Sequence, residues 1–246
     1  CALVFSSDGG MNILALVTAR GRSKTIPRKN LARLGGKSLI SWTLDLARDC
    51  SDLDRVVVST DDEEIAEEAR RRGAETPFLR PSALARDEST SMGAALHALN
   101  WLDEHQGYRP HYLMLLQPTS PFRISEDIEK TLALARDHAA DSVVSVCPVH
   151  HHDPKLLMRI NAEGRMTPYD GASNAPVRRQ DLPPVYALNG AVFLVRRDFL
   201  LERRKWYDER TYAYVMPAER SMDIDTPWEL YVADLIMKDR MQRGTG

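Results

Sequence analysis

Five cations crowd into one short loop, and their types suggest what the loop binds. They lie within ten residues of one another: Arg20, Arg22, Lys24, Arg28 and Lys29. Guanidinium groups can fork phosphate oxygens and ammonium groups supply point charges, while Gly21 permits a tight backbone and Ser23 offers a hydroxyl and an amide. Such a loop suits a triphosphate. The alternative interpretation is a solvated basic loop.

A pair of carboxylates near the end of the chain is the second chemical signal. Asp223 and Asp225 are spaced i, i+2, which puts both side chains on one side of an extended segment. Two hard oxygen ligands suit Mg²⁺ or Mn²⁺, with Mg²⁺ usually keeping waters and substrate phosphate oxygens as its other ligands. The alternative is helix capping. Thr226 and Glu229 already have capping-box spacing, however, so Asp225 is not needed as a cap.

Strands and helices must position these two groups. Six apolar or β-branched runs are predicted as strands, at residues 13–17, 55–59, 112–116, 142–146, 191–195 and 212–216. Helices are predicted over residues 39–48, 60–72, 92–102 and 128–135, with a last one beginning at Thr226. The second helix is predicted to open with a Thr60–Glu63 capping box. This alternation predicts a mostly parallel α/β sheet with right-handed crossovers.

The basic loop directly follows the first predicted strand, where open α/β sheets bind their ligands. Two familiar phosphate fingerprints are absent from it. Residues 36–38 look like the tail of a P-loop, but the required first glycine falls on Leu31, and no Gly-x-Gly-x-x-Gly occurs. We therefore expect residues 35–38 to form a turn into the first helix.

Composition excludes several classes of protein. The 246 residues carry 33 Lys+Arg against 35 Asp+Glu, a net charge of −2, which argues against nucleic acid as a partner. No apolar run approaches the roughly 20 residues that span a bilayer. Three scattered cysteines give no disulfide framework, so a reducing, cytoplasmic setting is expected. Residues 1–10 are predicted to be an upstream extension or remnant, and residues 11–246 the domain.

Several motifs together resemble one family. Residues 19–24 (ARGRSK) and 26–30 (IPRKN) resemble the signature loop of the acylneuraminate cytidylyltransferases, the CMP-sialic acid or CMP-nonulosonic acid synthetases. Residues 57–61 (VVSTD), 79–81 (LRP), 116–123 (LQPTSPFR), 188–191 (LNGA) and 221–226 (SMDIDT) follow in the family's order. Three residues depart from it: Arg22 replaces a second glycine, Thr25 a frequent glycine, and Leu188 an arginine found in several relatives.

The resemblance implies a role for individual residues. Nucleotide contacts are implied for Ala19, Arg20, Arg22, Ser23, Lys29, Asn30, Arg80 and Ser91. Sugar contacts are implied for Gln117, Lys155 and Arg179. Metal binding is implied for Asp223 and Asp225. The residues alone leave alternatives: Ser91 as a helix N-cap, Arg80 as a surface residue, and Lys155 and Arg179 as solvated loop cations.

The resemblance also implies a fold and a reaction. The fold is a three-layer, Rossmann-like sheet of the nucleotide-diphospho-sugar transferase kind, with a dimerisation insert at about 150–186 and hence a homodimer. The reaction couples CTP to an acidic nine-carbon sugar, a 3-deoxy-nonulosonic acid, and releases pyrophosphate. Arg20, Lys29, Asp223 and Asp225 would carry it by positioning and charge neutralisation. No general base stands out from the sequence.

Three other functions stay open at this stage. One is a nucleotidyltransferase for another sugar acid, including CMP-Kdo synthesis, or for another nucleoside triphosphate. Another is a metal-dependent glycosyltransferase, since an Asp-x-Asp pair also serves nucleoside diphosphates. The last is a nucleotide-binding protein without catalysis, a possibility that Arg22 and Thr25 keep open. Pyrophosphate release distinguishes a nucleotidyltransferase from a glycosyltransferase, and CTP binding without turnover would favour the non-catalytic protein.

Overall fold

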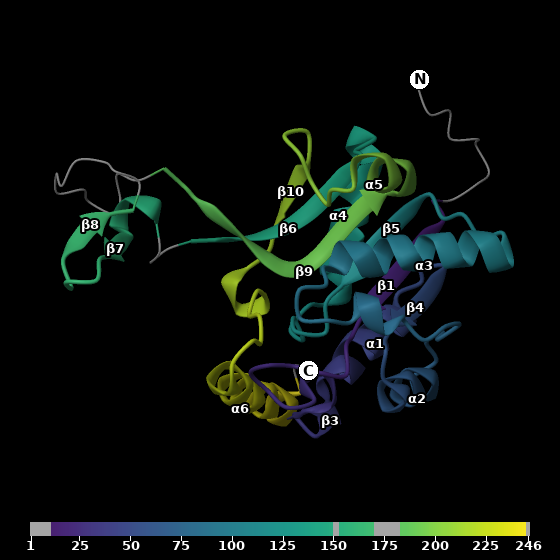
Figure 1. Ribbon diagram of the computed structural model, residues 1–246, viewed down its shortest axis with the longest axis horizontal. Coiled ribbons are helices and arrows are strands. Elements are labelled where there is room, and N and C mark those ends of the chain that lie inside the picture. Colours follow the sequence, from purple (N-terminus) through teal and green to yellow (C-terminus); the bar gives the residue numbers. More distant parts are fainter. Residues whose placement is uncertain (1–10, 150–152, 170–182, 245–246) are drawn as a thin grey trace.

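The computed structural model describes residues 11–149, 153–169 and 183–244, and its centre is a six-stranded sheet (Figure 1). The strand order is β10-β6-β9-β5-β1-β4. The strands are β1 (Ile13–Thr18), β4 (Arg55–Ser59), β5 (Tyr112–Leu116), β6 (Ser142–Pro148), β9 (Tyr186–Arg196) and β10 (Tyr212–Val215). Strand β9 runs antiparallel to β5 and β6, while the other pairings are parallel. The predicted, mostly parallel sheet is confirmed.

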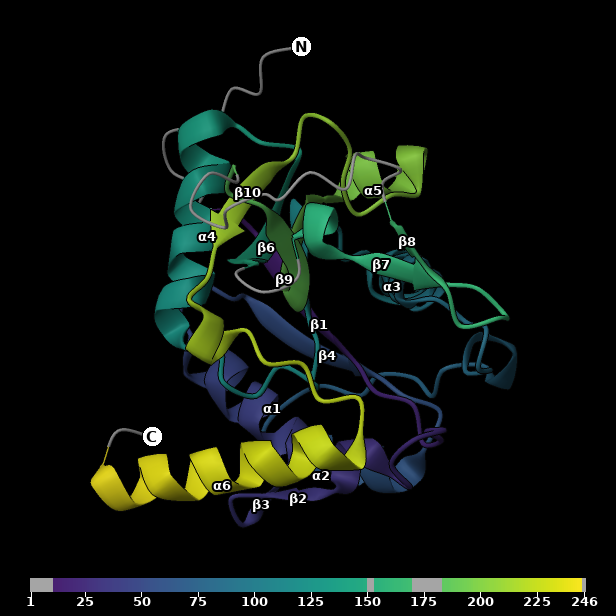
Figure 2. The same cartoon turned by 90° about the vertical axis from the view of Figure 1, so that its left-hand side faces the viewer.

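Helices cover both faces of the sheet and make three layers (Figure 2). On one face, α1 (Leu39–Asp49), α2 (Glu63–Arg71) and α4 (Ser125–His138) pack against the side chains of Ile13, Ala15 and Val17. On the other, α3 (Ser91–Gln106) and α5 (Arg197–Arg203) pack around Leu14 and Leu16. Because neighbouring β1 side chains point to opposite faces, an unbroken apolar run is what this doubly covered strand needs.

A last helix and a small hairpin extend the body. Helix α6 (Pro227–Arg243) is capped by Thr226, which forms the predicted capping box with Glu229. Its Met237 packs near the hairpin of β2 (Arg33–Leu34) and β3 (Lys37–Ser38). The hairpin turns at Gly35 and Gly36, whose φ angles are 55° and 85°. The segment is therefore a turn into α1, as predicted, and not a phosphate loop.

Two predicted helix starts are wrong by one or two residues. Helix α2 is capped by Asp62, whose carboxylate accepts from the Ile65 N–H, while the Thr60 hydroxyl accepts from the N–H of Asp62 instead. Helix α3 is capped by Thr90, and Ser91 is its first helical residue. In both cases a neighbouring side chain competes for the orphan N–H groups of the first turn, which spacing alone does not resolve.

An arm extends from the body at one end of the sheet (Figure 1). It continues the β6–β9 ribbon and carries η3 (Pro154–Leu156) and a hairpin of β7 (Met158–Ile160) and β8 (Met166–Pro168). The segment predicted to be irregular thus contains a regular hairpin. Residues 150–152 and 170–182, including Arg179, lie outside the described residues. In the described ranges, no helix is long and apolar enough to cross a membrane.

Candidate active site

The sheet topology brings several loops to one edge. Strands β1, β4 and β5 are parallel, so their carboxyl ends all lie at this edge, and antiparallel β9 passes it near Gly190. The edge therefore gathers the basic loop (residues 19–30), Asp61 after β4, and Gln117 after β5. The acidic loop (residues 216–225) connects β10 to α6 and reaches the same place, where Lys29 contacts Asp225.

Close packing on the β4 loop shapes the basic loop. The Gly21 N–H donates to Asp61 Oδ1 over 3.0 Å, and a Cβ on Gly21 would lie 2.6 Å from Asp62 Oδ2, so a side chain would not fit there. The Asn30 amide donates to the carbonyl of Arg20 over 2.9 Å and closes the loop on itself. Asn30 therefore uses this donor within the protein, although its side chain also borders the cleft described next.

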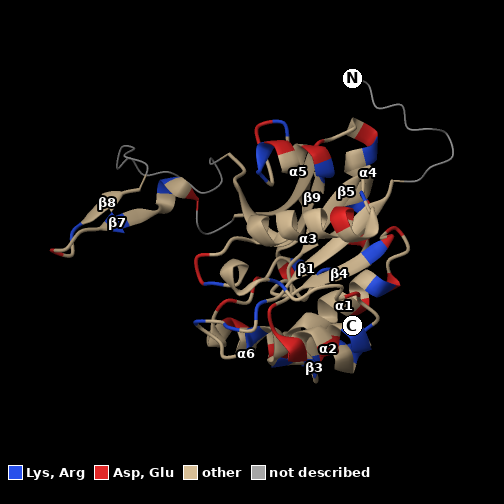
Figure 3. Cartoon of the chain, turned by 45° about the vertical axis from the view of Figure 1, so that its right-hand side comes forward, with Lys and Arg blue, Asp and Glu red and all other residues tan. Residues whose placement is uncertain are grey.

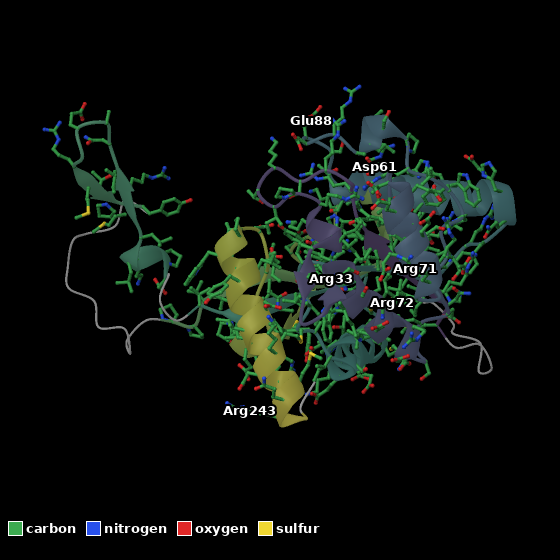
Figure 4. The ribbon with its side chains drawn as sticks, turned by 90° about the horizontal axis from the view of Figure 1, so that it is seen from below. Arg33, Asp61, Arg71, Arg72, Glu88 and Arg243 are labelled. Carbon is green, nitrogen blue, oxygen red and sulfur yellow. The ribbon has the colours of Figure 1, made fainter. Side chains whose placement is uncertain are left out.

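Most of the predicted nucleotide and sugar contacts come together around two adjacent clefts. One is lined by Arg20, Lys29, Asn30, Arg80, Ser91 and Gln117 among others. The second is lined by Arg22, Ser23, Lys24, Asp61, Asp87 and Glu88 among others, and Figure 4 labels Asp61 and Glu88. Ala19 lines neither cleft: it is buried, and its N–H donates to the Ser59 carbonyl over 3.1 Å.

Carboxylates pair with the cations of the basic loop. Arg20 and Lys24 contact the two carboxylate oxygens of Asp87 at 3.1 and 3.3 Å, and Arg20 also donates to the carbonyl of Arg86. Arg28 contacts Asp62 at 3.2 Å. These pairs are solvent-exposed, and such pairs contribute about 0–1 kcal/mol each. A phosphate could therefore replace Asp87 as a partner at little cost.

Arg80 is buried and has unused donors. Only 7% of the residue is exposed, so the surface interpretation is wrong. Its Nε and Nη2 atoms have no hydrogen-bond partner, and Asp61 lies 3.8 Å away. Burial lowers the pKa of Arg80, an effect that the charge of Asp61 opposes and that of Arg20 adds to. A ligand acceptor in the cleft would satisfy donors that are costly to leave unpaired.

The carboxylates of the acidic loop flank a buried residue. Ile224 is fully buried and its N–H donates to the carbonyl of Thr119 over 2.9 Å, which leaves Asp223 and Asp225 on the other side of the extended segment. Asp225 is exposed and pairs with Lys29 at 2.8 Å. Lys29 also donates to the Ile224 carbonyl over 3.2 Å. The predicted pair thus lies against the basic loop.

The carboxylate of Asp223 is partly buried and incompletely hydrogen-bonded. Its Oδ1 atom is buried without a hydrogen-bond partner. Burial raises the pKa of Asp223 and the charge of Asp225 raises it further, whereas hydrogen bonding by Thr119 and the charge of Lys29 lower it. The described part of the chain has no cluster of three or more acidic, His or Cys side chains able to hold a metal. Two carboxylates fit Mg²⁺, which takes its remaining ligands from water and phosphate.

The predicted sugar contacts are only partly brought together. Gln117 borders the cleft, and a Cβ on Gly190 would lie 3.6 Å from its Oε1 atom and 3.8 Å from Asp223 Oδ2. Lys155 lies in η3, between β6 and the hairpin of β7 and β8. Figure 1 shows that this hairpin projects away from the body. Leu188 is half exposed on β9.

Three residues around the clefts, Asp61, Arg86 and Asp87, are not among the predicted site residues. Asp61 holds the basic loop, and its place directly after a strand was a usable signal. Asp87 and Arg86 contact Arg20 from the loop after η2 (Ser82–Leu84), and only the tertiary structure brings them there. Elsewhere, basic and acidic segments are interspersed over the body (Figure 3), as the near-zero net charge suggests.

The three-layer fold and the two adjacent clefts lined by cations and carboxylates are typical of nucleotide-binding α/β proteins. The chain belongs to the cytidylyltransferase family, whose family model matches residues 14–233. The resemblance predicted from the motifs is thereby confirmed.

Named relatives agree with this family. The chain is 35% identical to an N-acylneuraminate cytidylyltransferase of Streptococcus agalactiae over 88% of its own length and 51% of the relative's. It is 33% identical to the CMP-N,N'-diacetyllegionaminic acid synthase of Legionella pneumophila over 93% of this chain and 97% of that one. The chain thus spans about half the length of the first of these relatives and nearly all of the second.

Solved structures agree on the fold. A CMP:2-keto-3-deoxy-manno-octonic acid synthetase complexed with CTP matches with a TM-score of 0.69 at 16% identity, covering 93% of this chain and 99% of that one. A 4-diphosphocytidyl-2C-methyl-D-erythritol synthase from Anaerococcus prevotii matches with a TM-score of 0.63 at 15% identity, covering 94% and 100%. At these identities the likeness establishes the architecture alone.

Proposed function

We propose that this chain is a cytidylyltransferase that couples CTP to a 3-deoxy-nonulosonic acid and releases pyrophosphate. The observation that carries the proposal is the meeting of the basic and acidic loops, where Lys29 and Asp225 are 2.8 Å apart beside the cleft. The names of its relatives support the substrate class, since they include N-acylneuraminate, legionaminic acid and pseudaminic acid enzymes.

The reaction needs positioning and charge neutralisation more than covalent help. The anomeric hydroxyl of the sugar attacks the α-phosphorus of CTP, a new P–O bond forms, the bond to the β-phosphate's bridging oxygen breaks, and the hydroxyl proton passes to solvent. Arg20 and Lys29 line the cleft and would neutralise the triphosphate and the leaving pyrophosphate. Arg80 would donate its unpaired N–H groups to the cytidine.

A divalent cation belongs to the same proposal. Asp223 and Asp225 would hold Mg²⁺ or Mn²⁺, and the unpartnered Oδ1 atom of Asp223 supports this. When bound, such an ion neutralises phosphate charge and can acidify an attacking hydroxyl. Gln117 beside Gly190 would orient the sugar near these carboxylates.

A homodimer is the proposed assembly. The arm hairpin exposes Met158, Ile160 and Met166 at 49%, 70% and 66% of their surfaces, which a partner chain would cover. In such a dimer, Lys155 of one chain would reach the cleft of the other, while Arg179, the second basic residue expected to contact the sugar, lies outside the described residues. Light scattering after size exclusion should report twice the chain mass.

A cytoplasmic location is also proposed, and the free thiols of Cys50 and Cys147 suit a reducing compartment.

The experiment is a substrate panel. Purified protein with CTP and Mg²⁺ should release pyrophosphate with at least one of sialic, legionaminic and pseudaminic acid, and mass spectrometry should identify the CMP-sugar. Kdo in place of these acids, and UTP in place of CTP, test the nearest alternatives. A folded dimer that binds CTP by calorimetry but turns over none of these acids would contradict the proposal.

A further inference from the structure

Asn189 is a buried residue whose side-chain amide joins β6, β9 and the acidic loop. It lies at the start of the buried part of β9 with 4% of its surface exposed. Its Oδ1 accepts from the Ser145 hydroxyl of β6 at 2.6 Å and from the Ala191 N–H at 3.2 Å. Its Nδ2 donates to the Ser221 hydroxyl at 3.0 Å and to Met216 Sδ at 3.2 Å. Both ends of the amide are therefore engaged.

The contact with Ser221 reaches the acidic loop two residues before Asp223. The Ser221 hydroxyl accepts from Asn189 and donates to the Pro217 carbonyl over 2.8 Å, so it is held from both sides. Beyond Asp223, Ile224 is anchored to Thr119 by a backbone hydrogen bond. The Asp223 carboxylate thus lies on a short stretch of chain fixed at both ends.

Gly190, the residue after Asn189, faces the side chains of Gln117 and Asp223. Gly190 has a φ of 71°, and its absent Cβ would point at Gln117 Oε1 and Asp223 Oδ2. Asn189 and Gly190 therefore act on the same place in different ways. Gly190 leaves room in front of Gln117 and Asp223, while the amide of Asn189 holds the acidic loop at a fixed distance from β9.

We propose that Asn189 is a positioning residue that, through Ser221, sets the Asp223 carboxylate relative to Gln117 for cytidylyl transfer. The inference rests on the proposed function and goes beyond it, because neither residue is assigned a contact with a substrate. A displacement of about 1 Å in a reacting geometry costs on the order of 10²-fold in rate. Loss of the hydrogen bond between Asn189 and Ser221 should accordingly lower kcat markedly while the protein still folds.

The test compares two serine-to-alanine variants of the full chain. Ser221→Ala removes the hydroxyl that Asn189 holds. Ser142→Ala is the matched control, because the Ser142 hydroxyl is hydrogen-bonded to another side chain, the Thr211 hydroxyl, at 2.6 Å. Ser142 lies at the start of β6, four residues before Val146, whose carbonyl accepts from the Met216 N–H at the start of the acidic loop. Asn189→Asp is a second variant, which keeps the acceptor oxygen for Ser145 but has no N–H for Ser221.

We expect Ser221→Ala to lower kcat by about 10- to 100-fold, with the calorimetric Kd for CTP changed by less than about 2-fold. Mn²⁺ affinity in the presence of CTP, followed by electron paramagnetic resonance, should fall by about 10-fold. Ser142→Ala should change neither property, whatever it does to Tm. Unchanged kcat and Mn²⁺ affinity in Ser221→Ala, or equal losses in Ser142→Ala, would overturn the inference.

The Mn²⁺ arm separates this inference from the proposed function. If the unmodified protein transfers no cytidylyl group to any acid of the panel, the proposed function fails. A Mn²⁺ affinity that falls in Ser221→Ala and not in Ser142→Ala would still support a positioning role for Asn189.

Discussion

The two loops that form the candidate site are built in different ways. In the basic loop, Arg20 and Lys24 reach into solvent and share the exposed carboxylate of Asp87. Buried groups hold the acidic loop in place. Asn189 donates a hydrogen bond to the Ser221 hydroxyl, and the fully buried Asp127 forms an ion pair with Arg220 at 2.8 Å. Coulomb attraction between a cation and a phosphate changes little when the cation shifts slightly, so an exposed loop can supply it. Metal ligands must be placed within tenths of an ångström, which a loop held by buried groups can achieve.

Lys29 is the exception within the basic loop. Its side chain is 16% exposed, and it contacts both the Ile224 carbonyl and the Asp225 carboxylate. Thr25 adds a hydrogen bond from its hydroxyl to the Asp225 carbonyl. The two loops are therefore joined at one end. The comparison predicts that substitutions reduce activity least at the exposed cations and most at Asp223.

The largest effect should come from Asp223. We expect Asp223→Asn to lower kcat on the order of 10³-fold, because a bound ion contributes several kcal/mol of charge stabilisation. Asp225→Asn should follow it closely. Pyrophosphate release measures both, with Asp239→Asn on the exposed side of α6 as the control. Full activity in both site variants would refute the metal assignment.

Lys29 should rank second. Lys29→Met keeps the length of the side chain and removes its charge, so we expect kcat/KM for CTP to fall about 10²-fold. Lys24→Met is the matched control, since Lys24 is 69% exposed and its pair with Asp87 is weak. A loss below about 3-fold is expected there. Equal losses of kcat/KM in the two variants would show that Lys29 does not differ from the exposed cations of the basic loop.

The features that the sequence predicts, and those that it does not, follow the same division between local and tertiary contacts. The strands were predictable because buried parallel strands need continuous apolar runs, as in β1 and β5. The two loops were predictable because position after a strand and like-charge clustering are local properties. Asp87, Asn189 and Ser221 were not assigned, since their roles depend on hydrogen bonds between segments 32 to 67 residues apart. The helix caps failed where two polar residues compete for the same N–H groups.

A higher salt concentration should weaken the attraction of CTP to the basic loop and leave the acidic loop unaffected. Raising monovalent salt from about 0.1 M to 1 M shortens the Debye length from about 10 Å to about 3 Å. Exposed cations such as Arg22 should then attract CTP less, and we expect the KM for CTP to rise about 10-fold with kcat within about 2-fold. Steady-state kinetics at matched Mg²⁺ activity measure this. A fall in kcat at constant KM would contradict the assignment of CTP capture to the exposed cations.

The smallest effect should come from Thr25, one of the residues that departs from the family pattern. Its hydroxyl donates to the Asp225 carbonyl from an exposed position. A net hydrogen bond contributes about 0.5–1.5 kcal/mol, and solvent competes for this one, so Thr25→Val should lower kcat by about 3-fold. Thr25→Ser keeps the donor and should match the unmodified protein. If Thr25→Val has no effect while Lys29→Met does, Lys29 alone joins the two loops, and the family's frequent glycine at this position loses nothing in catalysis.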